Sequence, residues 1–114
     1  MQESSGKELF LWLLRRRQRY RVTGASMRPL LTEDDEVLVD LQAYRHQSPR
    51  VDDIVIARHP VQTGLRIIKR VKQVHGHGTY YLQGDNADGT RNSPCLVPAR
   101  SILGRVTSLF ASTK

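Results

Sequence analysis

The chain has 114 residues, of which 39% are hydrophobic and 25% are charged, and this excludes both a disordered protein and two domains of ordinary size. Its one cysteine, Cys95, excludes an intrachain disulfide and makes a reducing compartment, the cytoplasm, the simpler expectation. The formal net charge of +7 favours acidic partners, nucleic acid or anionic lipid without choosing among them.

Residues 1–20 are predicted to form an N-terminal amphipathic helix or extension, with the helix over residues 6–18. Its apolar run, Leu9 to Leu14, is far shorter than the roughly 20 residues that a membrane-spanning helix needs, so no transmembrane span is expected. The arginines follow the apolar run, which is the reverse of the order in a secretory signal. The helix either packs on its own domain or a partner, or contacts a membrane surface peripherally through Trp12.

From residue 21 to 114 the pattern changes to short apolar runs separated by turn residues, which predicts a single all-β or β-dominated domain. Strands are predicted over residues 20–23, 36–40, 53–57, 65–74, 79–83 and 102–110. The prolines that fall between these runs, where a missing N–H costs no ladder bond, are Pro49, Pro60, Pro94 and Pro98.

One predicted strand, Leu65 to Val74, places a lysine among apolar residues. Because successive side chains of a strand point to opposite faces, Lys69 shares its face with Ile67 and Val71. A lysine on an apolar face loses hydration, which lowers its pKa, and a neutral amine can take a proton from a serine hydroxyl. Alternatively, Lys69 runs along the surface and releases its ammonium into water.

Two turn regions contain side chains that could bind a metal ion. The segment His75-Gly76-His77 offers two imidazoles, but its glycines favour an exposed turn. The segment Gly84 to Gly89 favours a compact loop and lacks the ligand spacing of a calcium-binding EF-hand. A Cys-His protease site has no convincing spacing either. We therefore expect no metal and no cofactor.

Seven short motifs follow one another along the chain. They are Gly24-Ala25-Ser26-Met27-Arg28-Pro29-Leu30-Leu31, Asp35 with Val37 to Val39, Asp53-Ile54-Val55, Lys69-Arg70-Val71, Gly84-Asp85-Asn86, Val97-Pro98 and Ile102-Leu103-Gly104-Arg105-Val106. In this order they resemble the signal peptidase I family of Ser-Lys proteases, from about residue 21 to 107. The resemblance implies a signal-peptidase-like β-barrel core, similar to the C-terminal domain of SOS repressors, within a catalytic domain at 21–114.

The resemblance also implies roles for individual residues. Ser26 would be the nucleophile and its backbone N–H one oxyanion donor, Lys69 the general base, and Thr90 the hydroxyl that orients the lysine. For Lys69 to be largely neutral at about pH 7 to 8, its pKa must fall by roughly 2 to 3 from the ordinary value. The residues expected to shape the substrate site or its loops are Gly24, Met27, Pro29, Gly84, Asp85 and Asn86.

The chain departs from the family pattern in three places. Gly24 has no hydroxyl to complete the oxyanion hole, so a second donor must come from elsewhere. Asn92 and Pro94 stand where relatives carry an Asp and an Arg that form a supporting ion pair, which puts the rigidity of that loop in doubt. Asp34 and Asp52 replace two glycines, and aspartate is among the few residues that enter the left-handed region without large strain.

The short form without an anchor is similar to one branch of the family, the nickel-type superoxide dismutase maturation proteases. That similarity implies a soluble, cytoplasmic endopeptidase that removes an N-terminal propeptide, with the nickel superoxide dismutase precursor as its protein partner. One alternative is a self-cleaving peptidase of the SOS-repressor type, although the chain has no helix-turn-helix and no Ala-Gly cleavage site before Ser26. Another is an inactive relative that binds peptides or nucleic acid, for which the strands offer few aromatic residues.

Overall fold

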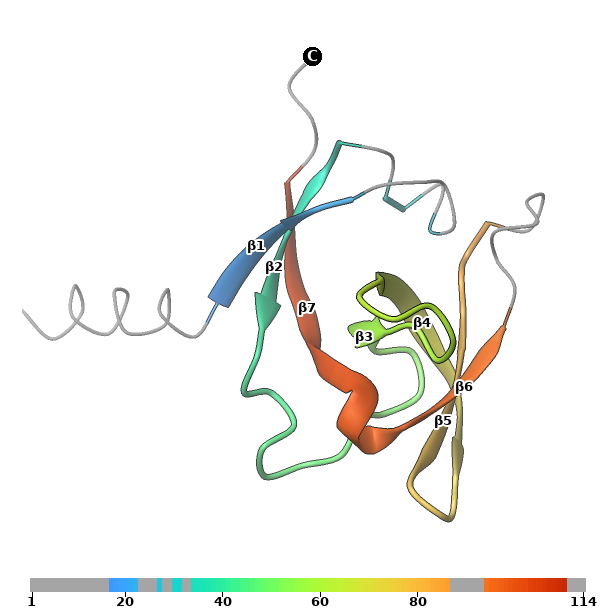
Figure 1. The fold of residues 1–114 in the computed structure, drawn as a ribbon. Coiled ribbons are helices and arrows are strands. Elements are labelled where there is room, and N and C mark those ends of the chain that lie inside the picture. The colour runs from blue at the N-terminus through green and yellow to red at the C-terminus, as the bar shows by residue number, and fades with distance from the viewer. Residues whose placement is uncertain (1–16, 23–26, 28–29, 32–33, 87–93, 111–114) are drawn as a thin grey trace, which may run out of the picture.

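The computed structural model describes residues 17–22, 27, 30–31, 34–86 and 94–110, and strands are the main regular secondary structure over this part (Figure 1). Its elements are β1 (Arg17–Arg21), β2 (Glu36–Asp40), β3 (Ile54–Arg58), β4 (Arg66–His75), β5 (Thr79–Gln83), β6 (Cys95–Pro98), the 3-10 turn η2 (Ala99–Ser101) and β7 (Ile102–Phe110). The prediction of an all-β domain is confirmed.

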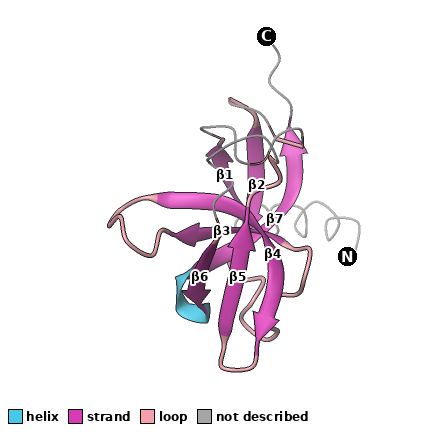
Figure 2. Ribbon diagram, turned by 90° about the vertical axis from the view of Figure 1, so that its right-hand side faces the viewer, coloured by secondary structure: helices cyan, strands magenta, loops and turns pink. Residues whose placement is uncertain are grey.

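The described strands form one antiparallel sheet in the order β1-β2-β7-β3-β4-β5-β6. β1 and β6 are its two edges, so these strands form an open sheet and the pairings do not close the expected barrel. The turn η2 leads from the edge strand β6 back to β7, which lies in the middle of the sheet (Figure 2). β7 therefore joins the β1–β2 pair to the other four strands.

The predicted boundaries hold best for strands with strong alternation. β2, β5 and β7 have the predicted bounds, and β3 and β4 differ by one residue at each end. β1 begins at Arg17 and ends at Arg21, so assigning residues 17–18 to the helix was wrong. Pairing with β2 explains this: the register runs from Arg17 opposite Asp40 to Arg21 opposite Glu36, and Arg19 Nη2 lies 2.8 Å from Glu36 Oε1. The rest of the predicted helix lies outside the described residues.

β6 is the strand that the sequence did not predict. It has only four residues, and Pro98, which was expected between strands, is its last. Proline is compatible with this position because β6 is an edge strand that pairs with β5 alone.

The sheet buries one core cluster on each face. The two clusters draw on alternate residues of β3, with Val55 and Ala57 in the first and Ile56 in the second, as the two-residue period of a strand requires. The first core cluster comprises Val55, Ala57, Val71, Tyr80, Leu82, Val97 and Ile102. The second core cluster comprises Val22, Met27, Leu31, Val37, Val39 and Ile56.

Two aspartates occupy the left-handed backbone region, as predicted. Asp34 has φ of 76° and Asp52 has φ of 79°. Both turns are fixed by backbone hydrogen bonds, since Asp34 N donates to Val22 O at 2.9 Å and Asp52 N donates to Val71 O at 2.8 Å. The replacement of glycine by aspartate therefore preserves both turns.

Gly104 lies where β7 approaches β2 closely. A Cβ atom at this position would lie 2.6 Å from Asp40 O and 2.7 Å from Val39 Cγ1. The irregular register of β2 and β7 brings the two backbones together at this point. The glycine of the Ile102 to Val106 motif is thus required by packing.

Candidate functional site

Lys69 lies on β4, directly opposite Val55 of β3, and only 8% of its surface is exposed. The same face of β4 carries the half-buried Ile67 and the fully buried Val71, both packed in the first core cluster. The predicted position of the lysine on an apolar face is confirmed. Most of the side chain is therefore covered by protein, which disfavours the alternative in which it runs along the surface.

Burial lowers the pKa of Lys69 below its ordinary value, because loss of hydration penalises the charged ammonium. Interaction with the nearby Cys95 opposes this shift and is the smaller effect. The direction is the one that a general base requires, since a lower pKa increases the fraction of neutral amine at any given pH.

Several predicted site residues lie outside the described part of the chain. They are Ser26, Gly24, Pro29 and Thr90. The described residues on either side of the Ser26 segment are held firmly. Val22 N donates to Asp35 O at 2.8 Å, and Met27 is buried in the second core cluster with its carbonyl accepting from Leu31 N at 2.9 Å.

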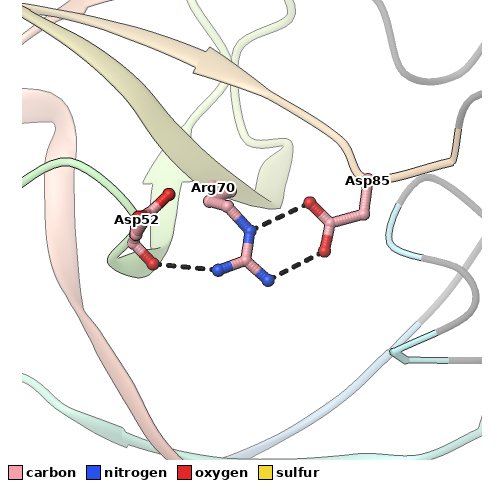
Figure 3. A network of polar contacts seen from close by, with 3 residues as sticks. All are labelled: Asp52, Arg70 and Asp85. Carbon is pink, nitrogen blue, oxygen red and sulfur yellow. Dashed lines mark hydrogen bonds and ion pairs between the residues drawn. The ribbon is translucent and has the colours of Figure 1, made fainter.

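Arg70, the residue after Lys69, forms a bidentate ion pair with Asp85 (Figure 3). Arg70 Nε donates to Asp85 Oδ1 at 3.0 Å and Nη2 donates to Oδ2 at 2.9 Å, while Nη1 donates to the Asp52 carbonyl at 3.0 Å. The hydrogen bonds to Asp85 raise the pKa of the guanidinium, which therefore stays charged. The Arg70 side chain thus connects β4 to the turn before β3 and to the loop after β5.

The sequence did not predict this ion pair, although its charges and spacing contained a signal. The turn at Gly76–Gly78 joins β4 to β5 and brings Arg70 opposite Gln83, two residues before Asp85. Folding the sequence about that turn would have brought the opposite charges together. The ion pair anchors the first part of the loop whose rigidity was in doubt because of Asn92 and Pro94.

The other residues of the Gly84-Asp85-Asn86 motif lie beside this ion pair. Gly84 is buried, and Asp85 and Asn86 are half-buried. The carboxylate of Asp85 is hydrogen-bonded across to Arg70 of β4. The remainder of that loop, residues 87–93, lies outside the described residues.

A second polar cluster lies on the connection from β2 to β3. Tyr44 Oη donates to Asp53 Oδ2 at 2.7 Å, and the same carboxylate oxygen accepts from Arg50 N at 3.1 Å. Burial and this hydrogen bond raise the pKa of Tyr44, so the phenol stays neutral. A shallow cavity of about 340 Å³ opens beside it, lined by Asp52, Asp53, Ile54, Arg105, Val106 and Thr107. Lys69 is not in its lining, so this cavity is separate from the candidate site.

The basic face of β4 is largely engaged within the molecule. Arg70 is bonded to Asp85, and the guanidinium of Arg66 lies 5.9 Å from the centre of the Tyr20 ring. These contacts leave fewer cations for phosphate groups than the sequence suggested.

Over the described residues, no helix has the length and apolar character needed to cross a bilayer. The family model for signal peptidase, peptidase S26, matches residues 9–77, more than half of the chain. The matched region includes the Ser26 and Lys69 motifs and ends before Gly84-Asp85-Asn86. No curated protein and no solved structure shows significant similarity to the chain.

Proposed function

The chain belongs to the signal peptidase S26 family, and from this premise we propose that it is a serine endopeptidase with Ser26 as nucleophile and Lys69 as general base. The observation that carries the proposal is the burial of Lys69 on an apolar strand face. Desolvation there lowers the pKa of the amine, and a neutral amine can accept the proton of a serine hydroxyl.

The proposed reaction has two stages. Ser26 Oγ bonds to the scissile carbonyl carbon as its proton passes to Lys69 Nζ; the C–N bond then breaks and the leaving amine takes that proton. Water next attacks the resulting ester, giving a proton to Lys69, and Ser26 Oγ recovers a proton as the ester bond breaks. The ion pair of Arg70 with Asp85 supports this chemistry because it holds β4 immediately beside the base.

The pairing of β4 supports an extended peptide as substrate. β4 pairs with β3 from Arg66 to Arg70, whereas its described pairing with β5 starts only at Arg70. Residues 66–68 therefore have a described strand partner on one side only, just before the proposed base. Peptides commonly bind by adding a strand to such an edge, so that backbone hydrogen bonds supply affinity independently of sequence.

The finer proposal is that the enzyme removes an N-terminal propeptide from the nickel superoxide dismutase precursor. It rests on the resemblance of the short chain to the maturation proteases of that branch. The basic character of the chain, with a formal net charge of +7, is compatible with an acidic substrate segment.

Substitution of the two proposed catalytic residues tests the reaction. We expect Ser26→Ala and Lys69→Ala each to abolish cleavage of a precursor or peptide substrate, and Lys69→Arg to fail too because a guanidinium does not release its proton. Cys95→Ser should retain cleavage near the optimum pH. Unchanged circular dichroism and melting temperature would show that the inactive variants are folded.

Retained cleavage by either alanine variant would contradict the proposed dyad. Loss of activity in Cys95→Ser with the fold intact would indicate a cysteine nucleophile. Incubation of the purified chain alone tests the self-cleaving alternative, because an unchanged intact mass would exclude self-cleavage.

A further inference from the structure

The strand register brings Cys95 to the same face of the sheet as Lys69. Val71 of β4 lies opposite Leu82 of β5, and Leu82 lies opposite Cys95 of β6. Directly opposed residues point to the same face, and Lys69 shares the face of Val71 because it lies two residues before it. Cys95 also packs against the first core cluster, of which Val71 and Leu82 are members.

Gly84 follows β5, the strand that lies between those of Lys69 and Cys95. β5 ends at Gln83, opposite Arg70, and continuing the register by one residue places the buried Gly84 opposite Lys69. Glycine contributes no side chain there. On the intervening strand, Leu82 therefore lies between Val71 and Cys95, whereas the position opposite Lys69 carries no side chain.

Lys69 and Cys95 interact electrostatically, but burial has the larger effect on the pKa of each residue. Attraction between a thiolate and an ammonium would lower the pKa of Cys95 and raise that of Lys69. Instead the pKa of Cys95 is raised and that of Lys69 is lowered, in each case mainly by loss of hydration. In each of the two residues, loss of hydration therefore outweighs the attraction between an ammonium and a thiolate.

Other ionisable groups face the same side of the sheet. Tyr80 of β5 belongs to the first core cluster and Tyr44, hydrogen-bonded to Asp53, packs against it. Arg105 of β7 lies opposite Val55, across that residue from Lys69. Cys95 raises the pKa of Lys69, and Lys69 in turn lowers the pKa of Cys95, each against the larger effect of burial.

We propose that Cys95 is a positioning residue for Lys69, whose half-buried sulfur completes the apolar wall beside the amine without presenting a charge to it. The inference rests on the proposed function in so far as Lys69 is the base of the reaction. A carboxylate at position 95 would stabilise the ammonium and remove the base, whereas a neutral side chain of the same shape would not.

The test compares Cys95→Asp with its uncharged counterpart Cys95→Asn. The titration of Lys69 is followed in each full-length variant by NMR of its side-chain carbon, with the signal identified by its loss in Lys69→Met. An opposite charge within about 4 to 6 Å shifts a pKa by about 1 to 3, so we expect the Lys69 midpoint to lie at least about one pH unit higher in Cys95→Asp than in Cys95→Asn. The acid limb of the cleavage rate against pH should move by the same amount.

Equal Lys69 midpoints in the two variants would overturn the inference. If the midpoint moves but the cleavage profile does not follow, Lys69 is not the base, and the proposed function fails while its coupling to Cys95 stands.

A reciprocal measurement covers the case in which Cys95→Asp does not fold. The rate of Cys95 alkylation by iodoacetamide is measured against pH in the unsubstituted chain and in Lys69→Met. Because the ammonium favours the thiolate, removing it should move the alkylation midpoint to higher pH. An unchanged midpoint would show that the two side chains do not interact, and would overturn the proposal.

Discussion

At the scale of single residues, the buried lysine destabilises the fold to which it belongs. Its pKa is lower in the folded than in the unfolded chain, so between these two pKa values the unfolded state binds more protons at this site. We expect Lys69→Met, which keeps a long side chain without a charge, to unfold with a higher free energy than the unsubstituted chain at neutral pH.

The pH dependence of that difference follows from the sign of the shift. Below the lowered pKa the full penalty is present, and it decreases as pH rises from there towards the ordinary value of 10.5. Urea unfolding of both chains across this range measures it. A difference that is independent of pH would mean that Lys69 titrates in the folded protein as it does in water.

Individual residues were predictable from the sequence where one local rule decides their environment. The two-residue period of a strand was sufficient to predict the burial of Lys69, and the tolerance of aspartate for positive φ was sufficient for Asp34 and Asp52. The partner of Arg70 was not predictable in this way. Alternation gives the face on which a side chain lies, whereas finding Asp85 requires the register of two strands.

At the scale of elements, the contact between β2 and β7 depends on the absence of a side chain at Gly104. We expect Gly104→Ala to lower the free energy of unfolding by about 1 to 3 kcal/mol, because its Cβ would meet the Asp40 backbone, which cannot rotate away as a side chain could. Thermal or urea unfolding measures this loss.

Gly76→Ala is the matched control, since a Cβ at Gly76 would have no atom within 4 Å. It should change the free energy of unfolding by less than about 0.5 kcal/mol. Equal effects of the two substitutions would indicate that the close approach at Gly104 does not hold in solution.

Elements were predictable where the apolar period was strong and less so at the edges of the sheet. β1 and β6 are the two edge strands, and β1 was displaced while β6 was not predicted at all. An edge strand needs less apolar alternation because neighbours cover less of it, and Gln18, Arg19 and Leu96 are accordingly exposed. Pairing with β2 and β5, which the sequence pattern does not reveal, determines both strands.

At the scale of the whole molecule, the substrate is the feature to test. Co-expression with a nickel superoxide dismutase precursor should give a product shortened at its N-terminus, and mass spectrometry identifies the new terminus. The same precursor co-expressed with Ser26→Ala should stay intact. An intact precursor beside the unsubstituted enzyme would exclude this substrate while leaving the peptidase activity open to other precursors.

The all-β class followed from the run lengths and turn residues, but the order of the strands did not. Local patterns specify where strands lie in the chain, and hairpins such as β4–β5 follow from short turns. The position of β7 between β2 and β3 depends on contacts between residues far apart in sequence, such as Val39 with Val106 and Ile56 with Gly104. No local pattern encodes such contacts.

The central place of β7 has a consequence for how the protein is made. β7 leaves the ribosome after every strand that it joins, and the described strand pairings connect β1–β2 to β3–β6 through β7 alone. The strand pairings that join β2 to β3 can therefore form only after the chain has been synthesised as far as β7.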